Sequence, residues 1–439
     1  MKKVINKFLL YVGIFILLIL TFNISLYISS CFNSNLIERK VSESYEILNK
    51  EGMFYKISNL FNIRSDNSAD ALIINECYSI DSKEPYMSYM KARKNYKNGL
   101  SNYEIKEDVG ELKTYVEIID DETKEYYNTI AELGDLLHDR IHIYKNYGRY
   151  WHGYLVFIRP LLLIFNIMQL RNISFLVFSI LFLYFINLIY KKFGKDIAVI
   201  YGLSLICSGY FSASYILEVS PVFILMMISS IVLLKNIDKI KDFSIYIFII
   251  SCITNFIDYL TVPLITLCIP ISIYLLKLFR DKKDFKYCIK FLIKNSFIWL
   301  FGYSFTWISK WVLYDLTIKD TSMLNIGFGQ ALFRMQRVNE AVGISVSYIS
   351  IILEILMKSM IYILVTLLIL LFLNSFKFNK LNKNAITFLL LSSYAIIWYI
   401  VLANHTILHN YFTYRNSLIF MLSILLFLKE SFFYDLKKG

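Results

Sequence analysis

The chain has 439 residues and a net charge of +12; 57% of its residues are hydrophobic and only 18% are charged. Soluble domains carry charge on about a quarter of their residues, so this composition excludes an ordinary soluble fold. The positive charge does not indicate nucleic-acid binding, because the basic cytoplasmic loops of a multispanning protein produce the same excess. We therefore expect a membrane lipid bilayer as a partner, and no nucleic acid.

Residues 1–31 are predicted to form an N-terminal transmembrane anchor helix. Lys2, Lys3 and Lys7 precede an apolar run from Phe8 to about Ser30, which is typical of a signal anchor whose basic end stays in the cytoplasm. The alternative is a lipobox, in which the segment ending at Cys31 directs cleavage and lipidation of that cysteine. The apolar run is longer than a usual signal sequence, which favours the anchor.

Residues 32–150 differ sharply in composition from the rest of the chain. They hold most of the acidic residues and contain no apolar run long enough to span a membrane. Apolar residues recur at helical spacing over 37–49 and over 111–142, so we expect a mainly helical, extracytoplasmic soluble insert.

Two apolar segments do not fit a simple transmembrane helix. Residues 151–172 include Arg159 and Pro160, and residues 346–357 are amphipathic. Irregular or interfacial helices of this kind are tolerated where they border a cavity or lie on the membrane surface. We therefore predict that both are interfacial or re-entrant segments on the outer side.

Residues 173–439 are predicted to form the multispan transmembrane domain, because further apolar runs follow one another with short loops. These runs lie at about 173–190, 197–213, 220–235, 243–258, 260–276, 290–307, 358–373, 385–403 and 416–428. Alternate loops are rich in lysine and arginine, and this alternation places both termini in the cytoplasm. The predicted fold is thus an all-α polytopic membrane protein with about ten transmembrane helices and the insert after the first.

Under this topology the unusual polar residues gather on the outer side. They are His138, His142, His152, His405 and His409, the acids Glu218 and Asp258, and the bases Arg159, Lys310 and Arg415. Polar groups at membrane depth are costly and usually face a functional cavity. A functional surface is therefore expected to face outward.

Two carboxylates in the insert are candidates for acid–base chemistry. Asp66 and Asp70 lie four residues apart in a polar stretch, so one carboxylate could deprotonate an acceptor hydroxyl while the other orients it or holds a divalent cation. The alternative is structural: Asp66 would be the N-cap of a following helix. The sequence requires no cofactor, and a divalent cation is compatible with it.

Two further segments combine aromatic and basic residues. Residues 147–153 bring Arg149, Trp151 and His152 together where the insert meets the membrane; aromatic rings stack on sugars and arginine pairs with phosphate, but such aromatics are also ordinary interface residues. Residues 404–415 contain His405 and His409, whose i, i+4 spacing suits a metal, and Arg415. An anionic headgroup bound by Arg415 is the favoured interpretation, and the metal content stays unknown.

The layout of the chain resembles the GT-C superfamily of membrane glycosyltransferases. The resemblance covers residues 1 to about 235 and rests on the large outer loop after one helix, the segment Arg159–Leu162 ahead of a span, the turn at 190–195 and Glu218 in the second outer loop. Residues 258–263 and 405–415 are similar to segments of uncharacterised Gram-positive membrane proteins of this general kind.

This resemblance implies an inverting glycosyltransferase in the bacterial cell membrane. It would take a sugar from a polyprenyl-phosphate carrier and pass it to a cell-envelope glycan or lipid acceptor on the outer face. A first-loop carboxylate, Asp66 or Asp70, would be the base, and Glu218 a second acid. Arg149, Arg159 or Arg415 would bind the lipid phosphate.

Other functions are weighed against this one. A lipid or polysaccharide transporter or flippase should show two related halves with interrupted helices and charges near the middle of the bilayer; the sequence has no such symmetry. A lipid-linked glycan polymerase usually carries its largest loop late in the chain, unlike this protein. A non-catalytic envelope scaffold would use the insert for docking.

Overall fold

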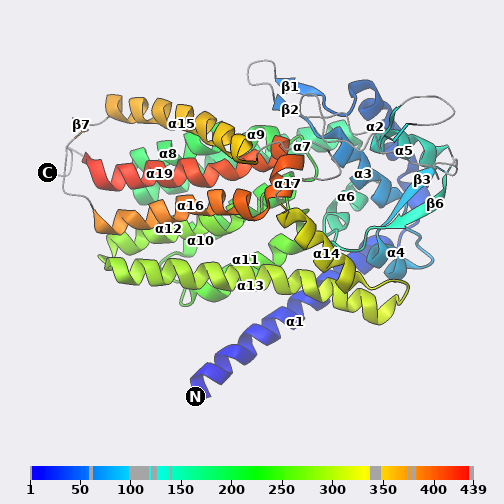
Figure 1. Cartoon of the computed structure of the whole chain (residues 1–439), viewed down its shortest axis with the longest axis horizontal. Coiled ribbons are helices and arrows are strands. Elements are labelled where there is room, and N and C mark those ends of the chain that lie inside the picture. The colour runs from blue at the N-terminus through cyan, green and yellow to red at the C-terminus, as the bar shows by residue number, and fades with distance from the viewer. Residues whose placement is uncertain are drawn as a thin grey trace.

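The structure is a computed structural model that describes residues 2–58, 63–97, 118–119, 126–138, 141–336, 348–373, 375–376 and 382–434. These residues are predominantly α-helical (Figure 1). Four short two-stranded antiparallel ladders accompany the helices in the described part of the chain. The predicted all-α class is therefore confirmed.

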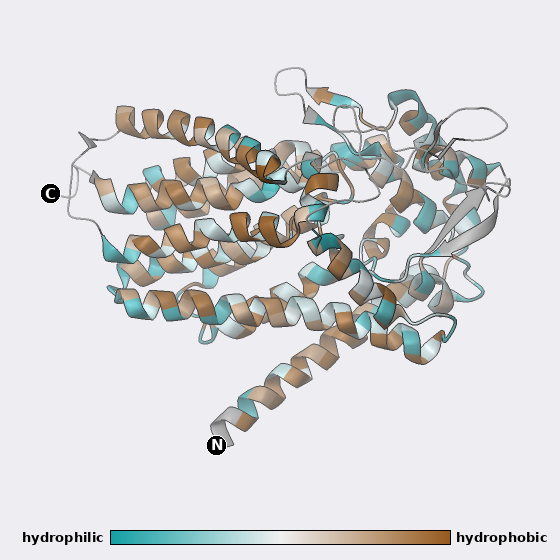
Figure 2. Ribbon diagram, viewed as in Figure 1, coloured by the Kyte–Doolittle hydropathy of each residue, from teal (hydrophilic) through white to brown (hydrophobic). Residues whose placement is uncertain are grey.

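Long apolar helices identify a membrane protein. In the described part of the chain, four stretches are long and apolar enough to cross a membrane: α1 (Lys2–Ser30), α7 (Ile167–Phe193), α15 (Tyr348–Leu373), and the stretch Lys383–Val401 that contains η3 (Lys383–Ala385) and α16 (Ile386–Val401). Figure 2 shows these helices as mainly hydrophobic ribbons. Ten membrane crossings remain a prediction.

Other helices complete the bundle beside these four. They are α8 (Lys195–Cys207), α9 (Tyr210–Ala213), α10 (Ser220–Asn236), α11 (Phe243–Ile257), α12 (Ile265–Arg280), α13 (Phe285–Thr317) and α19 (Ser417–Phe432). Between them lie the shorter elements α14 (Met323–Met335), α17 (Ala403–Leu408), α18 (Asn410–Thr413) and η4 (Tyr414–Asn416), and β7 (Ser375–Phe376) pairs with β8 (Phe433–Tyr434). Each predicted apolar run thus contains a helix.

Three boundaries differ from the sequence prediction. Helix α12 starts at Ile265 rather than near residue 260, because the Asp258 carboxylate accepts hydrogen bonds from the backbone and hydroxyl of Thr261 and holds a turn there. Helix α7 starts at Ile167, where Asn166 and Gln169 form a capping box. Residues 348–357, predicted to form a separate interfacial helix, instead begin the continuous helix α15, since no Gly or Pro interrupts them.

The described residues between 32 and 150 form a module of helices and short strands at one end of the bundle (Figure 1). Its described elements are η1 (Ser34–Leu36), α2 (Glu38–Glu51), α3 (Asn67–Tyr78), α4 (Pro85–Lys91) and α5 (Thr129–Leu137), with the ladders β1 (Lys56–Ser58) to β2 (Ile63–Arg64), β3 (Arg93–Lys97) to β6 (Ile141–Asn146), and β4 (Ile118–Ile119) to β5 (Tyr126–Tyr127).

The helical prediction for residues 111–142 is wrong over the described strands. Among the described residues of this stretch, α5 is helical, whereas 118–119, 126–127 and 141–142 are extended. Ile118, Ile119, Tyr126 and Tyr127 are β-branched or aromatic, and such side chains pack well on a paired strand. Residues 111–117, 120–125 and 139–140 of the predicted stretch lie outside the described residues.

The opposite end of the bundle is tied together by charged residues. Lys192 in the last turn of α7 pairs with Asp238 after α10 at 2.6 Å, and Lys429 of α19 pairs with Asp196 at the start of α8 at 2.7 Å. Lys7 of α1 is paired with Asp242 at the start of α11 at 2.5 Å. These contacts place the loops predicted to be basic, and the beginning of α1, at the end away from the module.

One buried arginine fixes the module to the membrane helices. Arg159 lies in α6 (Leu155–Leu161), with none of its surface exposed. Its guanidinium donates hydrogen bonds to the carbonyl oxygens of Ser29 (2.6 Å), Phe32 (2.7 Å) and Cys77 (3.0 Å). These oxygens belong to the end of α1, the following loop and the end of α3, so this contact, the Arg159 clamp, joins three segments.

Replacing Arg159 with alanine is expected to lower the thermal unfolding midpoint of the detergent-solubilised protein. Three buried carbonyl groups lose their donor together, and hydrogen bonds from charged groups contribute about 1.5–3 kcal/mol each, so the total loss should exceed about 3 kcal/mol. Arg39→Ala is the matched control, because the Arg39 side chain is 81% exposed. Equal unfolding midpoints for the two variants would contradict the importance of the clamp.

Candidate functional site

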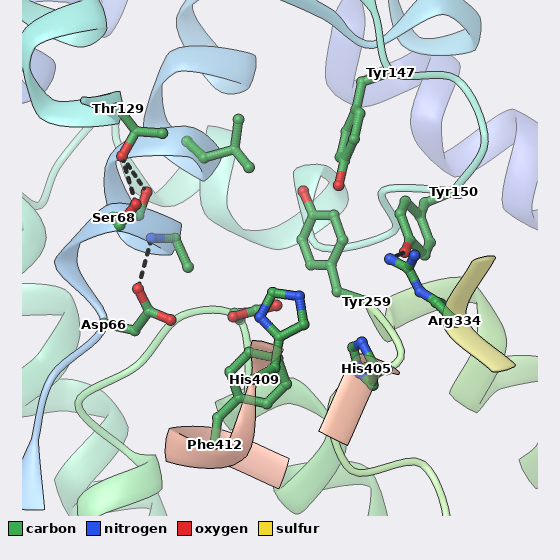
Figure 3. A pocket seen from close by; sticks show the side chains of 13 residues that line it. Asp66, Ser68, Thr129, Tyr147, Tyr150, Tyr259, Arg334, His405, His409 and Phe412 are labelled. Atoms are coloured by element: carbon green, nitrogen blue, oxygen red, sulfur yellow. Dashed lines mark hydrogen bonds between the residues drawn. The ribbon is translucent and has the colours of Figure 1, made fainter. Parts of the chain in front are cut away.

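A pocket of about 160 Å³ lies where the module meets the bundle (Figure 3). Its walls come from segments that are far apart in the sequence. The lining residues are Asp66, Ser68, Ala69, Leu72, Thr129, Tyr147, Tyr150, Glu218, Tyr259, Arg334, His405, His409 and Phe412. The pocket thus brings Asp66, Glu218, His405 and His409 together among the residues that the sequence singled out.

The first wall of the pocket is the N-terminus of α3. Asp66 is the N-cap of this helix, and its Oδ1 accepts a hydrogen bond of 3.0 Å from the backbone N–H of Ala69. The structural role predicted for Asp66 is therefore real. Its 3% exposed side chain also lines the pocket, so the capping role and a role in the pocket coexist.

Glu218 lies in the loop before α10 and completes the acidic side of the pocket. Burial raises its pKa well above the ordinary value, and the negative charges of Asp66, Asp258 and Asp70 raise it further. The positive charge of Arg415 lowers it in part. Glu218 therefore holds a proton at higher pH than an ordinary glutamate does.

A cation and three tyrosines form the opposite wall (Figure 3). Arg334, near the end of α14, donates a hydrogen bond of 2.6 Å to the Tyr150 hydroxyl. The Tyr150 ring meets the edge of Tyr259 at a centroid distance of 5.3 Å and lies 5.6 Å from the ring of Tyr147. Aromatic surface and one guanidinium thus face the two carboxylates.

Two histidines of the 403–412 segment occupy the space between these walls. The Nε2 of His405 lies 2.9 Å from the Leu260 carbonyl oxygen and must donate to it, which leaves Nδ1 as an acceptor. This Nδ1 is buried and has no hydrogen-bond partner in the described structure. Burial lowers the pKa of His405 well below its usual value and that of His409 to about 3, so both rings are neutral.

Backbone strain beside the pocket supports this arrangement. His152 and Leu260 have φ angles of +55° and +69°, in the left-handed region that L residues seldom adopt. The turn at Leu260 directs its carbonyl oxygen to His405, and the Asp258 carboxylate holds the same turn. Strained residues of this kind concentrate at functional sites.

Several predicted site residues lie outside the pocket lining. Asp70 is fully buried in an ion pair of 2.9 Å with Arg171, and Arg159 forms the clamp described above. Asp258 holds the turn before α12 and accepts a hydrogen bond from Tyr303. These residues serve the architecture because their hydrogen-bonding atoms are directed at protein groups.

The remaining predicted residues surround the pocket without lining it. Arg149 lies over the Tyr147 ring at 4.3 Å, and the indole N–H of Trp151 donates to the Thr306 carbonyl oxygen at 2.7 Å. Arg415 lies over Tyr414 at 4.8 Å, and its charge acts on Glu218. Arg149 and Arg415 therefore act on the pocket through their neighbours.

His152 belongs to a buried polar cluster behind the tyrosine wall. Its Nδ1 lies 3.1 Å from Glu76 Oε2 and 2.6 Å from the Tyr154 hydroxyl, while Nε2 donates to the Tyr147 carbonyl oxygen at 2.9 Å. The hydroxyl of Tyr259 donates to the same Glu76 oxygen at 3.0 Å. This cluster fixes Tyr259, which lines the pocket.

Sequence reasoning did not find Arg334, and of the tyrosine wall it singled out only Tyr147 and Tyr150, as part of the aromatic segment 147–153. Arg334 ends an amphipathic helix whose exposed face carries Phe328 and Leu332, so a lone basic residue at the end of an apolar outer segment is the signal that was available. Tyr150 and Tyr259 flank the predicted residues Arg149 and Asp258 in the sequence. Among 34 tyrosines, nothing in the local sequence marks Tyr259 as a pocket residue.

The described residues contain no group of three or more His, Cys, Asp or Glu side chains arranged to hold a metal ion. Comparison of the chain with family models, curated proteins and solved structures finds no match.

Replacing Glu218 with glutamine is expected to stabilise the protein at high pH. The pKa of Glu218 is raised in the folded state, so its contribution to stability is full below the unfolded pKa of about 4.3 and is lost as pH rises through the folded value. Glutamine resembles the protonated form at every pH. The thermal midpoint should therefore rise by about 2 °C at pH 8, and the gain should shrink as pH falls toward 5. Exposed Glu84→Gln is the control; a gain independent of pH would argue against a raised pKa.

Proposed function

We propose that this protein is a membrane glycosyltransferase of the GT-C type. It transfers a sugar from a polyprenyl-phosphate carrier to a hydroxyl of a cell-envelope glycan or lipid. The observation that carries the proposal is the convergence of Asp66 and Glu218 with Arg334 across one pocket. Two carboxylates face one guanidinium, which matches the needs of a reaction with a hydroxyl nucleophile and a phosphate leaving group.

The charge distribution suits a ligand that is rich in hydroxyls at one end and anionic at the other. Asp66, Glu218 and the buried Nδ1 of His405 are hydrogen-bond acceptors. A ligand in this half must supply donors, as sugar hydroxyls do, and aromatic rings such as Tyr150 and Tyr259 offer an apolar face to a sugar ring. Arg334 is the group of the lining set that would pair with phosphate.

The two carboxylates have different environments. Asp66 caps the N-terminus of α3, where the helix dipole favours an anion. The pKa of Glu218 is raised, and a base whose pKa lies nearer the working pH accepts a proton more effectively. In the proposed reaction Glu218 removes the acceptor proton and Asp66 orients the hydroxyl. The oxygen then attacks the anomeric carbon, and the carrier phosphate leaves with the electrons of the broken bond.

The proposed topology places this pocket on the outer face. The charged loops tied together by the pairs Lys192 to Asp238 and Lys429 to Asp196 lie at the end away from the module, and lysine-rich loops favour the cytoplasm. With both termini inside and about ten crossings, residues 32–150 are the extracytoplasmic insert and the pocket lies between it and the membrane.

Sugar transfer in membranes containing the full chain tests the proposal. The probes are polyprenyl-phosphate sugars labelled in the sugar, and the readout is label in a non-carrier product. Glu218→Gln should lower kcat at least about 100-fold, as expected when a general base is lost. Asp81→Asn is the control because Asp81 is an exposed carboxyl of the same module. Full activity of Glu218→Gln and Asp66→Asn would remove this site assignment.

Arg334 variants test recognition of the phosphate. Arg334→Gln should raise the KM for the lipid-linked donor by about tenfold or more, because a charge-assisted hydrogen bond to an anion contributes about 1.5–3 kcal/mol. The KM of Arg334→Lys should lie between those of the parent protein and Arg334→Gln, because lysine keeps the positive charge but lacks the planar guanidinium that can donate two parallel hydrogen bonds. An unchanged KM in Arg334→Gln would show that the phosphate binds elsewhere.

The pH dependence tests the carboxylate pair. Activity should rise with pH as Glu218 loses its proton, with a midpoint above the ordinary glutamate value of about 4.3. The negative charge of Asp66 raises the pKa of Glu218, so the residual activity of Asp66→Asn should have its acidic limb at lower pH. If the acidic limb of the Asp66→Asn profile stays at the same pH or moves to higher pH, the coupling between Asp66 and Glu218 is contradicted.

A further inference from the structure

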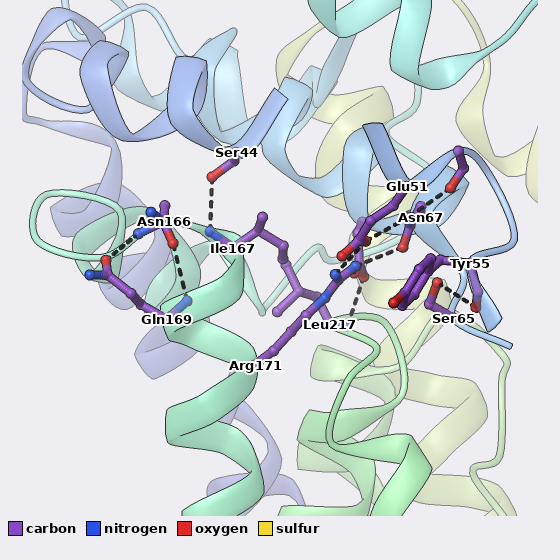
Figure 4. Close-up of polar contacts among 12 residues, drawn as sticks. Ser44, Glu51, Tyr55, Ser65, Asn67, Asn166, Ile167, Gln169, Arg171 and Leu217 are labelled. Carbon is purple, nitrogen blue, oxygen red and sulfur yellow. Dashed lines mark hydrogen bonds and ion pairs between the residues drawn. The ribbon is translucent and has the colours of Figure 1, made fainter. Parts of the chain in front are cut away.

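A buried arginine of α7 connects the module to the loop that carries Glu218. Arg171 is 2% exposed. Its guanidinium contacts Glu51 Oε2 at 2.8 Å, Asn67 Oδ1 at 2.7 Å and Asp70 Oδ2 at 2.9 Å (Figure 4). These partners belong to the end of α2 and the first turn of α3. One guanidinium therefore joins two helices of the module to a long apolar helix.

The carboxylate of Asp70 is shared between two partners. While Oδ2 pairs with Arg171, Oδ1 accepts a hydrogen bond of 2.8 Å from the backbone N–H of Leu217. Leu217 immediately precedes Glu218. The backbone of the Glu218 loop is thus attached, through one fully buried carboxylate, to the helix whose N-cap is Asp66.

We propose that Asp70 is a positioning residue, which holds the backbone at Leu217 so that Glu218 stays on the acidic side of the pocket with Asp66, and that Arg171 holds Asp70 in place. This inference rests on the proposed function for its kinetic consequence but not for its structural one. Both oxygens of Asp70 are bound by protein donors, so Asp70 supports the site without touching substrate.

The geometry explains why asparagine cannot replace Asp70. Both partners, the Arg171 guanidinium and the Leu217 N–H, are donors, and each needs an acceptor. The carboxamide of asparagine has a single acceptor oxygen, and its NH₂ group faces the other donor. Asp70→Asn therefore loses either the contact to Arg171 or the contact to Leu217.

Glu51 offers a matched control within the same cluster. It pairs with the same guanidinium, and its Oε2 also accepts from the Asn67 side chain at 3.0 Å, but these contacts do not include the Glu218 loop. Glu51→Gln removes one negative charge from Arg171, as Asp70→Asn does, and keeps an acceptor oxygen. A merely structural role for Asp70 predicts similar behaviour of the two variants.

Amide hydrogen exchange of the full-length protein in detergent is the first readout, because it needs no enzymatic activity. In Asp70→Asn, exchange in peptides containing Leu217 should be about tenfold faster, since the Leu217 N–H loses its acceptor in a large share of the molecules. In Glu51→Gln, these peptides should exchange as in the parent protein. Equal exchange of the Leu217 peptides in parent and Asp70→Asn would overturn the inference, as would equal acceleration in both variants.

Sugar transfer is the second readout. Asp70→Asn should lower kcat at least about tenfold with less than a twofold change in the KM for the lipid-linked donor, because the base is displaced while Arg334 is untouched. Glu51→Gln should keep kcat within about twofold. If the parent protein transfers no sugar, the proposed function fails while the exchange result still decides the role of Asp70. If sugar is transferred and kcat is equal in the two variants, the positioning role is wrong.

Discussion

The ion pair between Asp70 and Arg171 is the contact on which the arrangement of the pocket depends. It lies at the point where a helix of the polar module, a long apolar helix and the Glu218 loop meet. Isolated buried charges are costly, and a pair of them is stable only when hydrogen bonds occupy the remaining atoms. Asn67, Glu51 and the Leu217 N–H occupy most of these atoms, and among the described residues the Arg171 Nε has no hydrogen-bond partner. The same groups that satisfy the charge thereby also position the neighbouring carboxylates.

In the pocket itself, the acidic and basic side chains lie on separate walls. Asp66 and Glu218 line its acidic side, while the guanidinium of Arg334 on the other side is directed at Tyr150. Two neutral histidines separate the acidic and basic walls. In the proposed function, a ligand with hydroxyls and an anionic group bridges these two sides.

The sequence predicted the features that depend on long apolar runs. It did not predict those that depend on contacts between residues remote in the sequence. Apolar runs predicted the helices because lipid-facing or buried helices need about 20 apolar residues. The acidic and histidine residues of the outer loops were found because polar groups are rare in such a chain. The sequence could not show which of Asp66 and Asp70 lines the pocket, because this depends on the contacts of Asp70 with Arg171 and Leu217, which are remote from it in the sequence. Arg334 was missed for the same reason, as its partner Tyr150 lies in another segment.

The walls of the pocket are distributed from Asp66 to Phe412 along the chain. A membrane protein is inserted from its N-terminus as it is synthesised, so the module, the Arg159 clamp and the Asp70 contact can assemble before the 403–412 segment has left the ribosome. His405, His409 and Phe412 belong to that segment and close one side of the pocket. The acidic site therefore becomes enclosed only after a segment remote from it in the sequence has been synthesised and has packed against the module.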